Sequence, residues 1–463
     1  MNTVYHEVPP VARPGSRLGS VLAVACGAQV MVVLDSLIVN VALPQMKTGL
    51  GLSAADQQWL VNCYLITFGG LLLVAARMAD QLGHRRVFLA GLAVFTLASL
   101  VGGLAHQGWL LLAARTLQGV GAAAIAPCSL SLITLTHTDV RRRTHALSIW
   151  SATSGSAGAL GLVLGGILTD TLGWRWVLLV NVPVGVALFT AAAGLLQPAP
   201  TAGRTGFDLR GAGTVTLGTG SLVYGISQVT THGWGSPPVV TALVAAAALL
   251  GLFVVIEGRS RVPLIPLAVF KRRNVIIANA IMALIGAVMT ATLFFLSVYQ
   301  QQVLGYGPLL TGLALLPMSV VVTSGAIASK TMLAKLGART VLIGGAVTTT
   351  AGLLWMATLP VQAEYVMHIL GPTVLWAAGI SVMTMPVAHI ATAGIEPAHA
   401  GLASGLVNMS RQVGGAIGLA ALATVAATTS HGVDVVHGYN VALTVAAGIA
   451  LITALLALLT PNT

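Results

Sequence analysis

The sequence predicts an all-α polytopic membrane protein, because it is very apolar, carries few charges and contains long continuous apolar runs. Of its 463 residues, 56% are hydrophobic and 7% are charged, whereas about a quarter of the residues in a soluble domain are charged. The mean hydropathy is +0.91. This composition excludes a soluble enzyme and a disordered chain. The continuous runs indicate spanning helices, since a β-barrel would show short alternating segments.

Fourteen apolar runs are candidates for membrane-spanning helices. In chain order they are 20–43, 57–76, 87–105, 109–134, 145–168, 175–197, 209–229, 238–256, 275–299, 308–329, 340–359, 365–391, 400–428 and 440–460. The run 209–229 is the least distinct, because threonine and glycine are frequent in it. An even number of spans places both termini on the same side of the membrane.

The first run contains a carboxyl group deep in the bilayer. In a helix over Gly19–Pro44, Asp35 lies roughly 20 Å from the inner end, a little beyond the middle of a ~30 Å hydrocarbon core. Insertion scales assign an aspartate at this depth a cost of about 2.5–3.5 kcal/mol. We therefore expect Asp35 to face a cavity or a partner. Arg115, inside the fourth run, is the expected partner, through a direct or water-mediated contact.

The basic residues are concentrated in alternate loops. Eighteen of the 22 Lys and Arg residues lie in the N-terminal tail and the even-numbered loops, and two, Lys47 and Arg175, lie in odd-numbered loops. Arg115 and Arg411 lie inside runs. We expect the protein to lie in the cytoplasmic membrane. By the positive-inside rule, both of its termini are then expected in the cytoplasm. The net charge of +11 then reflects orientation, and no nucleic-acid partner is expected.

A repeat indicates two halves of similar structure. Residues 79–91 align without gaps with residues 333–345, and both segments follow the second run of a set of six. We expect three parts: residues 1–197 form an N-terminal six-helix bundle, 198–262 an inserted helix pair with linkers, and 263–463 a C-terminal six-helix bundle. Parallel halves around a central site are typical of a transporter.

Several short motifs are distributed over nearly the whole chain. They are Leu34-Asp35-Ser36-Leu37-Ile38-Val39-Asn40-Val41-Ala42-Leu43-Pro44, Ala79-Asp80-Gln81-Leu82-Gly83-His84-Arg85-Arg86, Arg115-Thr116-Leu117-Gln118-Gly119-Val120-Gly121, Gly161-Leu162-Val163-Leu164-Gly165-Gly166, Trp174-Arg175-Trp176 with Asn181-Val182-Pro183, and Gly401-Leu402-Ala403-Ser404-Gly405 with Arg411-Gln412-Val413-Gly414-Gly415. With these motifs the chain resembles the fourteen-spanner drug:proton antiporter family of the major facilitator superfamily. The resemblance implies two six-helix bundles plus two inserted helices. It also implies proton-coupled export of small lipophilic drugs or antibiotics by alternating access.

The resemblance also implies residue roles. They are proton coupling for Asp35 and Arg115, gating for Asp80, Gly83, Arg85 and Arg86, the substrate path for Asn40, Gln118 and Arg411, and close helix packing for Gly161, Gly165 and Gly166. Simpler interpretations remain open: a static ion pair, ordinary positive-inside charge, and hydrogen bonds from Arg411 to neighbouring carbonyls. The GxxxG spacing of the glycines by itself favours packing.

The sequence departs from the family pattern at three positions. Ala76 stands where the gating motif has its first glycine, Gln81 where it has an arginine, and Leu162 where the antiporter motif has a proline. Leu162 removes an expected kink. Leu162 therefore leaves open a proton-coupled uptake symporter of a small solute. A transport-inactive membrane sensor built on the same fold is a second, separate alternative.

We expect no enzyme activity, no cofactor and no metal, with the proton gradient as the energy source. The segment 324–331 is only a near miss to a phosphate-binding loop, because serine occupies both required glycine positions. The expected partners are a small-molecule substrate, protons and the lipid bilayer, and the expected state is a monomer. Because Asp35 is essentially the only carboxyl group expected in the cavity, we expect a neutral, zwitterionic or singly cationic lipophilic substrate.

Overall fold

The computed structural model describes residues 14–137, 139–197, 208–260, 263–264, 269, 272–393, 397–430 and 434–460. Helices make up nearly all of this part of the chain, and it contains no strand. The predicted all-α fold is confirmed. The basic residues at positions 13, 204, 261 and 271, which entered the orientation argument, lie outside the described residues.

The first half contains seven helices, followed by a pair that connects it to the second half. The helices of the first half are α1 (Pro14–Leu50), α2 (Ala54–Leu82), α3 (His84–Gly103), α4 (Gly108–Thr136), α5 (Val140–Thr171), α6 (Arg175–Leu179) and α7 (Asn181–Leu195). The connecting pair is α8 (Leu209–His232) and α9 (Pro237–Arg259). The least distinct of the predicted runs, 209–229, is thus a helix.

The second half contains α-helices and two short π-helical turns. They are α10 (Arg273–Val298), η2 (Tyr299–Val303), α11 (Pro308–Ala314), α12 (Leu316–Leu336), α13 (Ala338–Met356), η3 (Tyr365–Leu370), α14 (Gly371–Thr392), α15 (Pro397–Thr429) and α16 (Val435–Ala457). All fourteen predicted runs coincide with one helix or with two successive helical segments. Within the described residues, twelve of these are long and apolar enough to cross a membrane. The other two, α8 and α13, carry more threonine and glycine.

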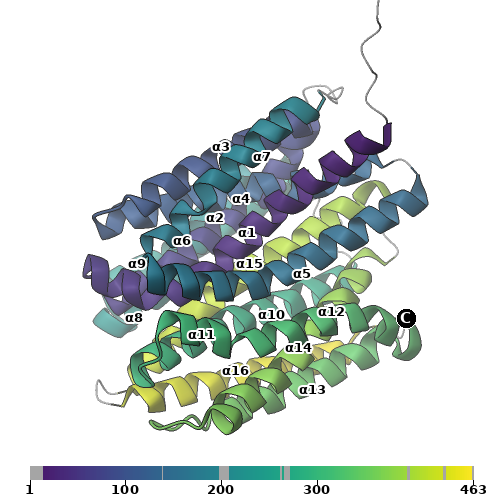
Figure 1. Cartoon of the computed structure of the whole chain (residues 1–463). Coiled ribbons are helices and arrows are strands. Elements are labelled where there is room, and N and C mark those ends of the chain that lie inside the picture. The colour runs from purple at the N-terminus through teal and green to yellow at the C-terminus, as the bar shows by residue number, and fades with distance from the viewer. Residues whose placement is uncertain are drawn as a thin grey trace, which may run out of the picture.

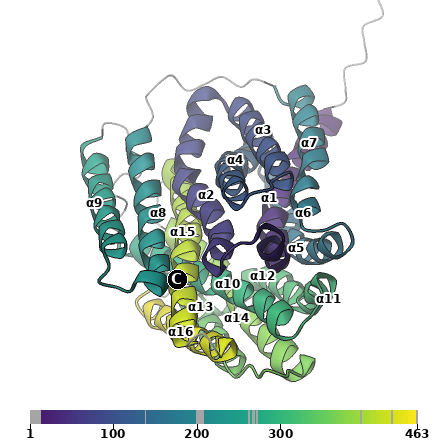
Figure 2. The same cartoon turned by 90° about the vertical axis from the view of Figure 1, so that its left-hand side faces the viewer.

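The two halves lie side by side, and the inserted pair stands at their edge. Figure 1 shows the N-terminal half, in purple and blue, beside the C-terminal half, in green and yellow. In Figure 2 α8 and α9 stand on one flank, and α8 packs against both α2 and α15. The hydroxyl of Thr424 on α15 donates a hydrogen bond of 3.0 Å to the carbonyl of Ile226 on α8. The inserted pair therefore contacts both halves.

The repeat between the halves appears as the same turn in both. Gly83 separates α2 from α3 with φ of 96°, and Gly337 separates α12 from α13 with φ of 77°. Each glycine N–H donates to the carbonyl four residues earlier, Ala79 or Leu333, at 3.0 Å. Residues that carry a Cβ rarely adopt a positive φ, so both positions favour glycine.

The two halves are held together at the end of the bundle where the loop between α1 and α2 lies. We call this end the α1–α2 end, and we call the opposite end the basic end. The Ser297 hydroxyl on α10 donates 2.7 Å to the carbonyl of Asn40 on α1. The Gln301 amide donates 2.9 Å to the carbonyl of Val41. The halves are thus closed at the α1–α2 end.

Candidate functional site

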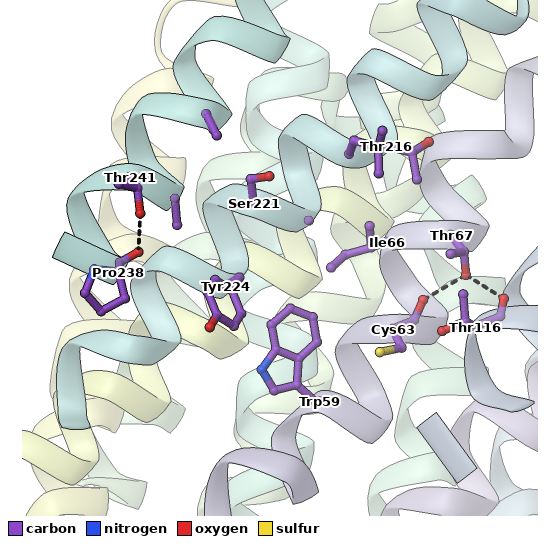
Figure 3. A pocket seen from close by; sticks show the side chains of 14 residues that line it. Trp59, Cys63, Ile66, Thr67, Thr116, Thr216, Ser221, Tyr224, Pro238 and Thr241 are labelled. Carbon is purple, nitrogen blue, oxygen red and sulfur yellow. Dashed lines mark hydrogen bonds between the residues drawn. The ribbon is translucent and has the colours of Figure 1, made fainter. Parts of the chain in front are cut away.

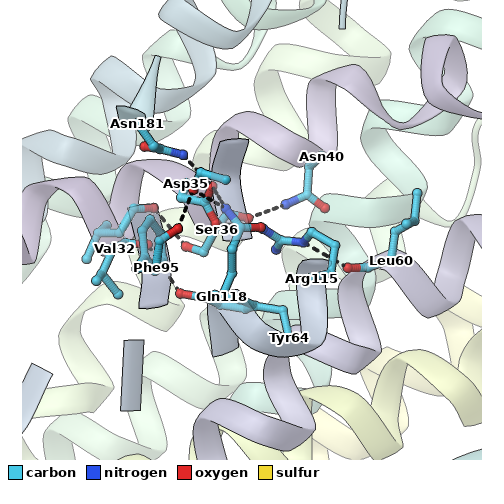
Figure 4. Close-up of polar contacts among 12 residues, drawn as sticks. Val32, Asp35, Ser36, Asn40, Leu60, Tyr64, Phe95, Arg115, Gln118 and Asn181 are labelled. Atoms are coloured by element: carbon cyan, nitrogen blue, oxygen red, sulfur yellow. Dashed lines mark hydrogen bonds and ion pairs between the residues drawn. The ribbon is translucent and has the colours of Figure 1, made fainter. Parts of the chain in front are cut away.

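Asp35 lies on α1 inside the N-terminal half, with 0% of its surface exposed. Figure 4 shows three side chains converging on its carboxylate. Arg115 Nη1 donates to Oδ2 at 2.6 Å, while Gln118 Nε2 and Asn181 Nδ2 donate to Oδ1 at 3.0 Å and 2.8 Å. A buried carboxylate is tolerated when charge and hydrogen bonds compensate for lost water. Asp35 has both.

Arg115 is 2% exposed and is held on three sides. Besides Asp35, its Nη1 donates to Gln118 Oε1 at 2.8 Å and its Nε to the Leu60 carbonyl on α2 at 3.2 Å. Its guanidinium carbon lies 4.5 Å from the ring centroid of Tyr64, a cation–π geometry. The ion pair is therefore direct, and its arginine is fixed by both α4 and α2.

The amide of Gln118 connects the two charged groups. Gln118 stands one turn after Arg115 on α4, so the two side chains share a face. Its oxygen accepts from Arg115, and its nitrogen donates to Asp35 and, at 2.8 Å, to the hydroxyl of Ser99 on α3. The cluster thus draws on α1, α2, α3, α4 and α7.

Two of the residues expected on the substrate path lie outside this cluster. Asn40 donates to the Ser36 carbonyl at 2.9 Å and accepts at its backbone from Ser297, so it stands where α1 meets α10. Arg411 is half-buried on α15 and donates to Asn408 Oδ1 at 3.1 Å. The third, Gln118, is fully buried in the cluster.

The expected gating residues meet at the turn between α2 and α3. Asp80, 62% exposed, is 3.4 Å from the Nε2 of His84. Arg85 donates a hydrogen bond of 2.8 Å to the carbonyl of Ala193 in the last turn of α7. A positive charge is stabilised at this end of a helix by the helix dipole. Arg86 is exposed. The turn thus connects three helix ends at the basic end.

The three glycines of α5 lie at close helix contacts. A Cβ at Gly161 would come within 3.1 Å of the Leu34 carbonyl, and one at Gly165 within 3.0 Å of the Ile38 carbonyl, both on α1. A Cβ at Gly166 would meet the Pro308 carbonyl of α11 at 2.7 Å. Gly161 and Gly165 therefore pack inside the first half, whereas Gly166 packs across the two halves.

Sequence reasoning did not assign three residues of the cluster. Asn181 was noted only as part of a motif, and Ser99 and Tyr64 were not singled out. Asn181 is 146 residues from its partner Asp35, and no spacing rule connects them. A polar side chain in the first turn after the break between α6 and α7 was the available signal.

Comparisons with known proteins agree on one family. The family model described as Major Facilitator Superfamily matches residues 25–419. The cephamycin export protein CmcT of Amycolatopsis lactamdurans is 42% identical over 446 residues, which cover 95% of this chain and 91% of the relative. The puromycin resistance protein pur8 of Streptomyces alboniger is 38% identical, over 94% of this chain and 90% of the relative.

A more distant relative and a solved structure extend the comparison. The tetracenomycin C resistance and export protein of Streptomyces glaucescens is 32% identical over 92% of this chain and 80% of the relative. The structure of a variant of the nucleoside transporter NupG matches with a TM-score of 0.66 and covers 96% of this chain and 99% of that one. At 13% identity, this last likeness shows the fold alone.

Proposed function

Because the chain belongs to the major facilitator superfamily, and is thus a membrane transporter and not an enzyme, we propose that it exports antibiotic-like small molecules in exchange for protons. Export is supported by the names of three relatives, which refer to export of or resistance to cephamycin, puromycin and tetracenomycin C. The same names support a small-molecule substrate, and its lipophilic character is part of our proposal. A symporter or a sensor has no such support.

The buried cluster around Asp35 is the observation that carries the proton-coupling part of the proposal. A proton on Asp35 removes the negative charge that compensates Arg115, and a buried arginine without a counter-ion is strongly unfavourable. The helices that hold the two groups must then separate or admit water. A substrate-driven change that restores the ion pair would expel the proton. Protonation and helix arrangement are coupled in this way.

Helix α1 provides a route from the proton site to the contact between the halves. Asp35 and Asn40 are five residues apart, so about 7.5 Å separates them along the helix. The Asn40 carbonyl accepts from Ser297 of α10. We infer that a shift of α1 on protonation loosens this contact and opens the α1–α2 end. Alternating access then follows from one helix that carries both groups.

The remaining site residues take supporting roles in this proposal. The turn with Asp80, Gly83, Arg85 and Arg86 joins the ends of α2, α3 and α7 and would latch the basic end. Arg411 lies on the second half, and Asn40 lies at the boundary between the halves. A substrate would pass both residues. Gln118 donates a hydrogen bond to Asp35, so its effect on the substrate path would be indirect, through the position of Asp35.

The setting of the protein follows from its charge distribution. We propose that it resides in the cytoplasmic membrane with the basic end and both termini in the cytoplasm, since the alternate loops that carry the basic residues face inward by the positive-inside rule. It would work as a monomer without a cofactor, and with the proton gradient as its energy source. A single chain contains both halves and the complete cluster.

The test uses everted membrane vesicles with an imposed proton gradient and a pH-sensitive dye. Neutral and cationic antibiotics are added to wild type, Asp35→Asn and the control Asp170→Asn, whose carboxyl is exposed at the end of α5. We expect some compounds to discharge the gradient in wild type and in the control, and none to do so in Asp35→Asn. Discharge by Asp35→Asn would remove Asp35 as the proton carrier. No discharge by any compound in wild type would contradict antiport.

A further inference from the structure

A groove of about 720 Å³ lies on the flank of the molecule, between α2, α4, α8 and α9. Figure 3 shows its lining, with Trp59 from α2 and Tyr224 from α8 close to each other. Their ring centroids are 6.3 Å apart at an interplanar angle of 46°. The groove is separate from the Asp35 cluster, because neither Asp35 nor Arg115 lines it.

From the positions of its lining along the helices, we infer that the groove lies within the depth of the membrane. Trp59 is in the second turn of α2, and Thr67, which also lines the groove, is about 12 Å further along the helix. Ser221 on α8 lies eleven residues before the end of that helix at His232, roughly 16 Å from the α1–α2 end. A molecule in the groove would thus be reached from lipid rather than from water.

Three hydrogen-bond donors in the groove are free. Within the described residues, the Trp59 indole N–H, the Ser221 hydroxyl and the Tyr224 phenol make no hydrogen bond to protein. In contrast, the hydroxyl of Thr67 donates to the carbonyl of Thr116 at 3.0 Å. A polar donor that faces hydrocarbon without a partner is unfavourable. A ligand with acceptor atoms would satisfy these donors, whereas a lipid acyl chain would not.

The lining also defines the charge and size of a ligand. None of the described residues that line the groove is charged, so it offers nothing to compensate an ion. Its volume lies in the range of pockets for drug-sized molecules. The tilted indole and phenol favour an aromatic ring packed against them.

We propose that this groove binds a neutral aromatic molecule of drug size that carries hydrogen-bond acceptors and enters from the lipid. Binding there is a property beyond the proposed export function and does not depend on it. The wall of the groove nevertheless reaches the proton site. Leu60 and Tyr64, which follow lining residues Trp59 and Cys63 on α2, hold Arg115 through its Nε and its guanidinium face.

The experiment measures binding of Prodan, a neutral naphthalene with a carbonyl acceptor, to the purified protein in lipid nanodiscs. The signal is energy transfer from tryptophan, after subtraction of empty nanodiscs. Gly220 lines the groove and a Cβ there would meet no atom within 4 Å, so Gly220→Phe fills the groove without displacing backbone. Gly213, on the same helix, has the same free space but does not line the groove. Gly213→Phe is the matched control.

We expect saturable binding to wild type and a loss of affinity of at least about tenfold in Gly220→Phe. Gly213→Phe should bind like wild type, so that a loss in Gly220→Phe cannot be a general effect of a phenylalanine on α8. Ser221→Ala adds no atom to the groove and so does not block it. This variant should weaken binding by about threefold to tenfold, because one hydrogen bond to the ligand is lost.

Two results would overturn the proposal. One is the absence of saturable Prodan binding to wild type. If, in addition, a phospholipid co-purifies with wild type but not with Gly220→Phe, the occupant of the groove is a lipid. The other is equal affinity of wild type, Gly220→Phe and Ser221→Ala, which would place the probe elsewhere.

Discussion

Asp35 remains buried because each of its oxygens has a donor, and Asn181 is the donor that comes from furthest along the chain. We predict that Asn181→Leu lowers the free energy of unfolding by about 1.5–3 kcal/mol, the usual value of a hydrogen bond to a charged group. The melting temperature in detergent measures the stability. Proton-coupled discharge in vesicles should fall as well, because Asp35 loses one of its three donors.

Asn62 provides a matched control for this prediction. It is 0% exposed, and within the described residues neither polar atom of its amide has a hydrogen-bond partner. Asn62→Leu removes unpaired polar atoms, so its stability should equal or exceed that of wild type. A melting temperature for Asn181→Leu equal to that of Asn62→Leu would show that the bond from Asn181 to Asp35 contributes nothing.

The core of this site was predictable from single residues, and its surroundings were not. An aspartate inside an apolar run must find a partner, which limits the choice to Arg115 and Arg411, the two arginines inside runs. Gln118 follows from helical spacing. Ser99 and Tyr64 are ordinary residues of apolar helices, and only the packing of α2, α3 and α4 brings them to the ion pair.

At the scale of elements, α5 is the helix whose glycines connect the halves. A Cβ at Gly166 would lie 2.7 Å from the Pro308 carbonyl and 2.9 Å from the Cα of Leu309, both backbone atoms of α11. Gly166→Ala should therefore weaken closure of the α1–α2 end by about 1–3 kcal/mol. Ser297, buried at the contact between α1 and α10, can report the opening.

The measurement is the rate at which a maleimide labels Ser297→Cys in a background without the native cysteines. We expect Gly166→Ala to raise that rate at least about fivefold. Gly155→Ala is the control, because a Cβ at Gly155 would meet Thr323 of α12 at 3.6 Å, an ordinary contact. Equal labelling in both variants would contradict a role for Gly166 in closing the halves.

Helix existence was predictable at this scale, but helix breaks were not. The run 175–197 is divided at Val180 into α6 and α7, three residues before Pro183. The run 365–391 begins with the π-helical turn η3 directly before Gly371 and Pro372. A proline removes one backbone donor, but whether the chain then kinks, breaks or forms a π-turn depends on packing by neighbouring helices.

At the scale of the whole molecule, the alignment of residues 79–91 with 333–345 correctly predicts the paired turns at Gly83 and Gly337. The position of the inserted pair was not predictable, since no pattern in α8 or α9 names its neighbours. The flank groove forms where α8 packs against α2, and residues of α9 and α4 complete its lining. The groove is therefore visible only in the assembled fold.

The distribution of acidic groups over the molecule limits the charge of a substrate. Among the described acidic residues, Asp35 alone lies in the middle of a helix, and the others lie in loops, at helix caps or within the terminal turns of helices. A dication in the interior would need compensation that one carboxylate, already paired with Arg115, does not supply.

Ethidium and propidium share an aromatic ring system but carry one and two positive charges, so they test this limit directly. We predict that, if either dye discharges the proton gradient of wild-type everted vesicles, ethidium does so at least about tenfold more efficiently, because an uncompensated charge in the interior costs several kcal/mol. Asp35→Asn vesicles give the background for both dyes. Comparable discharge by propidium would mean that a second acidic group reaches the substrate, and the assignment of Asp35 as the single interior carboxylate would fail.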